Sequence, residues 1–249
     1  MRMDTRIFPN LEILSLAAMD EMMRIISETI SLRGRFTIAL SGGHTPIRMF
    51  QLWADKPYRG DTPWEKVHLF WGDERYVPHE DERSNFRLAR DTFISHVPIP
   101  APNVHPIPTV AAPLDKSAEA YEKELRDFFG PEPPQIDLQL QGVGAEGHTA
   151  SLFPDSPALS EKQRWVLPVI PPAEISPPVD RITMTPIVLN RGRNTFFIVS
   201  GDDKRQIIAG LRAETSPQTS RFPAAHIQPP GPVLWFLDRA AAGSASVFA

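Results

Sequence analysis

Short apolar runs and amphipathic stretches alternate along most of the chain. Apolar residues recur at helical spacing over residues 11–32, which predicts a long helix with one buried face. Strand-length runs, apolar throughout or alternating, predict strands at 36–40, 67–71, 136–140, 165–170, 195–200 and 233–237. Helical patterns stand between most of these runs, at 46–52, 84–95, 115–129 and 204–211. This alternation is typical of an α/β fold with a mostly parallel sheet and helices on both faces.

The organisation of the chain is simple. We find no internal repeat and no clear linker, so we predict a single domain over residues 1–249. Proline is abundant, with 27 residues, and it gathers between the predicted elements. Proline-stiffened loops are therefore expected to connect them.

A glycine-rich turn, GVGAEGHTASLFP at 142–154, follows one predicted strand. Its three glycines permit a tight turn and close approach to a ligand. In open α/β sheets, ligands bind at the carboxyl ends of strands, which is where this turn lies. Histidine is the side chain best suited to proton transfer near neutral pH, and the turn holds Glu146 and His148 two residues apart. The pattern indicates either a catalytic turn or a glycine-rich connection with an exposed histidine.

A second turn, SGGHTP at 41–46, directly follows the strand at 36–40. Thr45 is a good helix N-cap and Pro46 a good first helical residue. Ser41, Gly42 and Gly43 would then stand where free backbone N–H groups and the positive end of the helix dipole favour a phosphate. The sequence is neither a Walker A loop nor a dinucleotide fingerprint. An ordinary tight turn is the alternative.

Charged residues follow two further strands. Asp73, Glu74 and Arg75 come after the strand at 67–71, where they form either a solvated loop or part of a site. Arg75 can bind a phosphate through two parallel hydrogen bonds, and Asp73 can position a hydroxyl or a cation. Lys204 stands near the start of a predicted helix, where the dipole disfavours a cation. It is either solvated or close to an anion.

Composition excludes several classes of function. A net charge of -4 argues against a nucleic-acid-coating surface, and the chain has no cysteine for disulfides or thiolate sites. No apolar run approaches the roughly 18 residues that span a bilayer, and no targeting segment is apparent. We therefore expect a cytoplasmic protein without nucleic-acid or membrane partners.

Seven motifs stand in the order found in one enzyme family. They are LSGGHTP at 40–46, WGDERYVP at 71–78, SNFR at 84–87, GVGAEGHTASLFP at 142–154, RITMTP at 181–186, SGDDK at 200–204 and VLWFLDRAA at 233–241. Through them the chain resembles the 6-phosphogluconolactonases of the glucosamine-6-phosphate isomerase/6-phosphogluconolactonase family. The resemblance implies a three-layer α/β fold, similar to that of glucosamine-6-phosphate deaminase. It also implies hydrolysis of a sugar-phosphate lactone without metal or organic cofactor. Separately, we expect a monomer.

The resemblance also implies roles for individual residues. His148 would be the general base that activates water. The phosphate and nearby oxygens would be held by Ser41, Gly42, Gly43, Thr45, Arg75 and Lys204. Asp73 and Arg181 would organise the site, and Asn85 is a further candidate for substrate binding.

One departure from the family pattern concerns Glu146, because the family usually has Asp two residues before the histidine. Glu146 either orients His148 from one methylene further out or only shapes the turn. The glucosamine-6-phosphate deaminases share the phosphate loop and are an alternative, but they read IAFNEP where this chain has TASLFP at 149–154. A non-catalytic sugar-phosphate sensor is the second alternative. Both a sensor and an enzyme would bind the sugar phosphate, so only a measurement of turnover distinguishes them.

Overall fold

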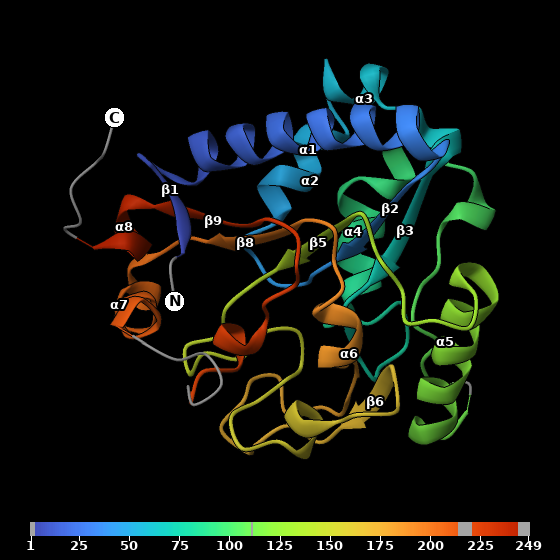
Figure 1. Ribbon diagram of the computed structural model, residues 1–249, viewed down its shortest axis with the longest axis vertical. Coiled ribbons are helices and arrows are strands. Elements are labelled where there is room, and N and C mark those ends of the chain that lie inside the picture. Colours follow the sequence, from blue (N-terminus) through green and yellow to red (C-terminus); the bar gives the residue numbers. More distant parts are fainter. Residues whose placement is uncertain (1–2, 111, 214–220, 244–249) are drawn as a thin grey trace.

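The computed structural model describes residues 3–110, 112–213 and 221–243 and contains a central six-stranded sheet (Figure 1). Every neighbouring pair in this sheet is parallel, which confirms the predicted mostly parallel sheet. From one edge to the other the strands are β1 (Asp4–Phe8), β9 (Val233–Asp238), β8 (Thr195–Val199), β5 (Leu138–Gln141), β2 (Phe36–Leu40) and β3 (Val67–Trp71).

Helices cover both faces of the central sheet. In Figure 1, α1 (Leu11–Arg33) and α2 (Ile47–Trp53) lie on one side, and α6 (Pro186–Leu189) and α7 (Arg205–Ala213) lie on the other. The remaining α-helices are α3 (Tyr58–Asp61), α4 (Asn85–Thr92), α5 (Leu114–Phe129) and α8 (Arg239–Ala242). Short 3-10 helices span Trp64–Lys66, Ile94–His96, Ala101–Asn103, Pro157–Ser160, Asp202–Lys204 and Pro223–His226. The central sheet and the helices on its two faces form the three layers of an α/β architecture.

Burial on both faces explains the apolar strand sequences. All five residues of β2 are buried, as are all five of β8. Phe197 on β8 stacks on Trp235 of β9 with the ring centroids 3.9 Å apart. Because both sides of the sheet are dry, the strands read as continuous apolar runs, which is why they were predictable.

The predicted ends of the helices are partly confirmed. Gly34 ends α1 with a φ of 75°, and the Ser84 hydroxyl caps α4 by accepting a hydrogen bond from the Arg87 N–H at 3.1 Å. The prediction for α2 was wrong, because Pro46 and not Thr45 occupies the N-cap position and no side chain caps this helix. A cap of this kind is set by backbone torsions that local sequence rules do not specify.

A second, smaller sheet was not predicted. It is antiparallel and consists of β4 (Asp73–Arg75), β7 (Arg181–Met184) and β6 (Val166–Val169). Residues 73–75 are therefore not a solvated loop. Glu74 is 1% exposed, and its carboxylate accepts hydrogen bonds from the Ser84 hydroxyl and from the backbone N–H groups of Arg75, Asn85 and Phe86. These partners offset part of the cost of burial, which still raises the pKa of Glu74 to about 7.

No helix within the described ranges is both long and apolar enough to cross a membrane.

A half-buried pair of histidines lies on the outer part of the central sheet. Nδ1 of His68, on β3, is 3.2 Å from Nε2 of His105, whose Nδ1 is 2.9 Å from a Glu124 carboxylate oxygen. Burial, together with the charges of His105 and Arg35, lowers the pKa of His68 to about 4. The folded protein therefore resists protonation of this side chain.

This pair predicts a loss of stability in acid. Since the pKa of His68 is depressed in the folded state, its contribution is present above an unfolded pKa of about 6.5 and is lost as pH falls towards 4. We expect His68→Gln to show a smaller drop in melting temperature between about pH 7.5 and about pH 5 than the parent protein. His96→Gln, at an exposed histidine, is the control. An unchanged drop in the His68 variant would contradict the prediction.

Candidate functional site

A cavity of about 460 Å³ opens at the carboxyl ends of three central strands. Ser41 follows β2, Gly142 follows β5 and Ser200 follows β8, and all three residues line it. The cavity brings together every site residue predicted from the sequence except Glu146, namely Ser41, Gly42, Gly43, Thr45, Asp73, Arg75, Asn85, His148, Arg181 and Lys204. Glu146 joins them indirectly, through His148.

His148 and Glu146 form a hydrogen-bonded pair at the tip of the turn after β5. Nδ1 of His148 is 2.6 Å from Oε1 of Glu146, and both side chains are about one-third exposed. The histidine ring also packs 5.0 Å from the ring of Phe153. A carboxylate at Nδ1 fixes the tautomer, so the lone pair of Nε2 is free to accept a proton.

The charge of Glu146 is maintained by its surroundings. Partial burial acts to raise the pKa of this carboxyl, but the hydrogen bond with His148 and the charges of His148 and Lys204 outweigh that effect. The net pKa of Glu146 therefore lies below its ordinary value, and the group is a carboxylate near neutral pH.

Gly144 provides the space for this pair. A Cβ at this position would lie 2.0 Å from Nδ1 of His148 and 2.8 Å from Oε2 of Glu146. The backbone N–H of Gly144 also donates to the carbonyl of His148 at 2.9 Å and closes the turn. Glycine is required here because the histidine ring lies directly against the backbone.

The second half of the turn is fixed to its neighbours through hydroxyl groups. The Thr149 hydroxyl donates to Oε1 of Gln141 at 2.8 Å. The Ser151 hydroxyl donates to the buried carboxylate of Asp73 at 2.6 Å, and the Ser151 N–H donates to the Thr183 hydroxyl at 3.2 Å. These supporting residues were not singled out from the sequence, because their partners lie on β5, β4 and β7 and no local pattern joins them.

Asn85 holds the glycine turn after β2 against β4. Its Nδ2 donates to the carbonyl of Asp73 at 3.0 Å, and the side chain is 2% exposed. A Cβ at Gly42 would lie 1.8 Å from Oδ1 of Asn85, so only glycine fits at this point of the turn. Gly43, the next residue, has a φ of 87°. Glycine is thus favoured at the two positions for different reasons. Gly42 leaves room for the Asn85 side chain, and Gly43 adopts a left-handed backbone conformation.

Two arginines face each other across the antiparallel sheet. Arg75 on β4 and Arg181 on β7 are register partners. Arg181 is 4% exposed and donates to the carbonyls of Val179 and Pro177, at 3.0 and 2.8 Å, and Arg75 donates to the carbonyl of Arg83 at 2.7 Å. Within the described residues neither guanidinium forms an ion pair with a carboxylate.

The two neighbouring positive charges repel each other, so a bound anion would be favourable here. Burial, and then the charge of Arg75, lowers the pKa of Arg181 to about 10, although Asp73 and Glu74 oppose the change. Arg181 therefore remains charged at neutral pH. Lys204 adds a third cation to the cavity, with Nζ 3.0 Å from the mostly exposed carboxylate of Asp203. The cavity combines a histidine–carboxylate pair with three basic side chains.

In the part of the chain that the structure describes, no group of three or more histidine, aspartate or glutamate side chains is arranged to hold a metal ion. The polar groups at the cavity suit proton transfer and anion binding, which are the needs of acyl transfer to water.

Comparisons of the sequence with a family model and with known proteins point to the same family. The model of the family described as glucosamine-6-phosphate isomerases/6-phosphogluconolactonase matches residues 9–235. The chain is 43% identical over 220 residues to a 6-phosphogluconolactonase of Synechocystis sp., covering 87% of both chains. It is 36% identical over 250 residues to that of a Nostoc strain, covering 99% of this chain and 100% of the relative.

Solved structures agree with the sequence relatives. The 6-phosphogluconolactonase from Trypanosoma cruzi superposes with a TM-score of 0.88 at 29% identity, covering 99% of this chain and 98% of the other. A monomeric glucosamine-6-phosphate deaminase superposes with a TM-score of 0.81 at 20% identity, covering 96% and 99%, and so shares the fold. The chain therefore belongs to the glucosamine-6-phosphate isomerase/6-phosphogluconolactonase family.

Proposed function

We propose that this protein hydrolyses 6-phospho-D-glucono-1,5-lactone to 6-phosphogluconate, as a 6-phosphogluconolactonase of the oxidative pentose phosphate pathway. The observation that carries the proposal is the His148–Glu146 pair, which shares one cavity with Arg75, Arg181 and Lys204. A base beside a cluster of cations matches a reaction in which water attacks an ester of an anionic sugar. A volume of about 460 Å³ also lies within the usual range of small-molecule sites.

The phosphate of the substrate is the natural partner of the glycine turn and the basic side chains. Ser41, Gly42, Gly43 and Thr45 offer backbone N–H groups and hydroxyls, and Arg75 and Lys204 supply charge. Nε of Arg75 is buried and has no hydrogen-bond partner in the described part of the chain. Anion binding would provide that partner.

Hydrolysis then proceeds in two steps. Nε2 of His148 takes a proton from a water molecule as the water oxygen bonds to the lactone carbonyl carbon, while Glu146 stabilises the resulting imidazolium. The carbonyl oxygen becomes an oxyanion, for which Arg181, held in place by two backbone carbonyls, supplies positive charge. Collapse of this intermediate breaks the bond to the ring oxygen, which leaves with the proton from His148. The product is the open-chain acid.

The test is turnover of freshly generated 6-phosphoglucono-δ-lactone with spontaneous hydrolysis subtracted. A parallel assay measures glucosamine-6-phosphate deamination. We expect lactone opening well above the spontaneous rate and no deamination. Deamination without lactone opening would instead identify a deaminase, and phosphosugar binding without any turnover would identify a sensor.

The contribution of Glu146 can be measured separately. Glu146→Asp keeps the charge but shortens the reach, so the 2.6 Å bond to His148 lengthens in this backbone. Glu146→Gln keeps the reach but removes the charge. We expect each change to lower kcat about tenfold, because the histidine loses either its orientation or the counter-charge of its imidazolium. Unchanged kcat in both variants would mean that Glu146 only shapes the turn.

A further inference from the structure

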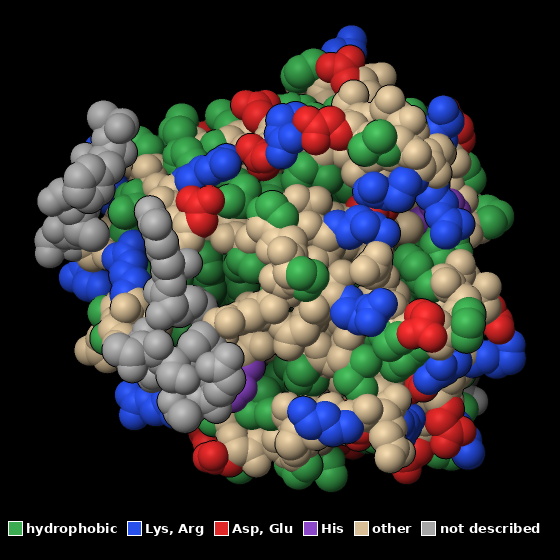
Figure 2. Space-filling view, in the orientation of Figure 1, with side chains coloured by type: hydrophobic (Ala, Val, Ile, Leu, Met, Phe, Trp, Pro, Cys, Tyr) green, Lys and Arg blue, Asp and Glu red, His purple; other side chains and the backbone are tan. Residues whose placement is uncertain are grey.

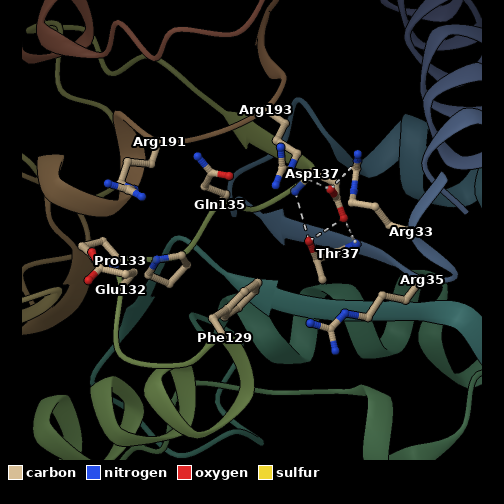
Figure 3. A pocket seen from close by; sticks show the side chains of 11 residues that line it. Arg33, Arg35, Thr37, Phe129, Glu132, Pro133, Gln135, Asp137, Arg191 and Arg193 are labelled. Atoms are coloured by element: carbon tan, nitrogen blue, oxygen red, sulfur yellow. Dashed lines mark hydrogen bonds and ion pairs between the residues drawn. The ribbon is translucent and has the colours of Figure 1, made fainter.

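A second cavity, of about 280 Å³, lies at the amino ends of the same strands (Figure 3). Its lining includes Arg35 and Asp137, which directly precede β2 and β5, and Arg193, which lies two residues before β8. The catalytic cavity is instead lined by residues that directly follow these strands. Five residues of parallel strand span about 16 Å, so the two cavities are separate. Figure 2 shows basic side chains gathered on the molecular surface over the region between α1 and α6.

The floor of this second cavity is the buried carboxylate of Asp137. It accepts hydrogen bonds from the backbone N–H and the hydroxyl of Thr37, at 2.9 and 2.8 Å, and from Arg33 at 2.7 Å. Nε of Arg193 approaches the same carboxylate at 3.4 Å. Asp137 thus neutralises one of the two arginines that it positions, and its own hydrogen-bonding capacity is largely used.

Two further arginines in the cavity have no carboxylate partner among the described residues. Arg35 lies with its guanidinium 4.4 Å from the centroid of the Phe128 ring. Nε of Arg191 is buried and makes no hydrogen bond within the described ranges. In Figure 3, Arg191 lies on one side of the cavity and Arg35 on the other, with Gln135 beside Arg191. Basic groups therefore approach the cavity from two sides.

The charge count leaves this cavity positive. Four arginines and two carboxylates, Asp137 and Glu132, line it, which leaves an excess of two positive charges. Glu132 lies near Arg191 in the view of Figure 3, but it forms no ion pair with that arginine in the structure. The chain as a whole is negative at -4, so its general charge does not explain a local positive excess.

We propose that this second cavity binds a small molecule that carries a diphosphate group or two separate phosphates. Guanidinium groups bind phosphate oxygens through paired hydrogen bonds, and Arg35 and Arg191 are the two lining arginines without a carboxylate partner in the described part of the chain. The volume of about 280 Å³ lies just below the roughly 300–1,000 Å³ of pockets for drug-sized ligands, which suits a small anion such as a diphosphate. The inference does not depend on the proposed catalytic function.

The experiment is calorimetric titration with inorganic pyrophosphate at low ionic strength. Arg35→Gln/Arg191→Gln removes the two unpartnered cations and leaves the arginines that hold Asp137. We expect its Kd for pyrophosphate to be at least about tenfold higher than that of the parent protein. Two matched double variants serve as controls, each removing two charges: Arg59→Gln/Arg239→Gln on the surface and Arg75→Gln/Lys204→Gln in the catalytic cavity. Melting curves establish that each variant is folded.

Each outcome decides the proposal. Weakened binding only in the Arg35/Arg191 variant supports the second cavity, and a weaker response to orthophosphate supports a ligand with two phosphate groups. Loss of binding only in the catalytic-cavity variant, an equal loss in all three variants, or no binding by the parent protein would overturn it. Titration with ADP distinguishes the sources: affinity equal to that for pyrophosphate indicates a free diphosphate, and tighter binding indicates a nucleoside diphosphate.

Discussion

We expect His148→Gln to lower turnover of 6-phosphoglucono-δ-lactone by about 10³-fold, within the range of about 10²–10⁴ that a general base contributes. Glutamine has similar size and can keep a hydrogen bond to the carboxylate of Glu146, which lies 2.6 Å from Nδ1 in the parent protein. It has no basic nitrogen that can take a proton from water. The loss should therefore fall on kcat, with little change in KM, because the cations proposed to bind the phosphate remain.

His44 provides the matched control, because it also lines the catalytic cavity and stands in the glycine turn after β2. We expect His44→Gln to retain most of the turnover. Both variants should melt within a few degrees of the parent protein, since His148 is partly exposed and His44 is exposed. Near-normal turnover in the His148 variant, or a loss that follows His44 instead, would remove His148 as the base.

The second large effect is expected from Gly144→Ala, which changes no chemical group. Its Cβ would lie 2.0 Å from Nδ1 of His148, far inside van der Waals contact, so the ring must move. A displacement of about 1 Å at a catalytic group can cost about 10²-fold in rate, and we expect a loss of kcat of at least that size. The hydrogen bond between His148 and Glu146 would be broken or distorted by the same movement.

The matched control is Gly60→Ala in α3, where an added Cβ meets no atom within 4 Å. This variant should keep full turnover and melt at or above the temperature of the parent protein, since alanine favours helix. Full activity in Gly144→Ala would show that the turn can move aside without displacing the base. Lost folding in that variant, seen as a collapsed melting transition, would be separated from lost activity by the melting curve itself.

The central sheet was predictable from sequence because its strands are buried on both faces. β2, β3, β8 and β9 are runs of apolar residues, and their predicted bounds lie within one residue of those observed. β1 was missed because Asp4, Thr5 and Arg6 give it the sequence of an exposed segment, and it lies at one of the two edges of the sheet. Each residue of β1 is exposed or only partly buried, so no apolar run marks this strand in the sequence.

The small sheet was missed for a different reason. β4 consists of Asp73, Glu74 and Arg75, and three consecutive charges normally indicate solvent. Their burial depends on partners supplied by β7, α4 and the turn after β5, none of which is adjacent in sequence. The same limit applies to Ser151 and to the arginine-lined cavity, whose residues come from three separate segments. The motifs around His148 and Gly42 were found because each is contiguous.

The position of β1 beside β9 also affects how the chain folds during synthesis. In the described sheet β9 is the one hydrogen-bonded neighbour of β1, yet the ribosome makes β9 more than 220 residues later. Pairing can begin between β2 and β3 and then extend through β5 and β8 as each strand emerges, so an unpaired apolar edge is exposed at every intermediate stage. The first strand made is the last to be placed. We therefore expect the growing chain to expose this edge until β9 has emerged from the ribosome.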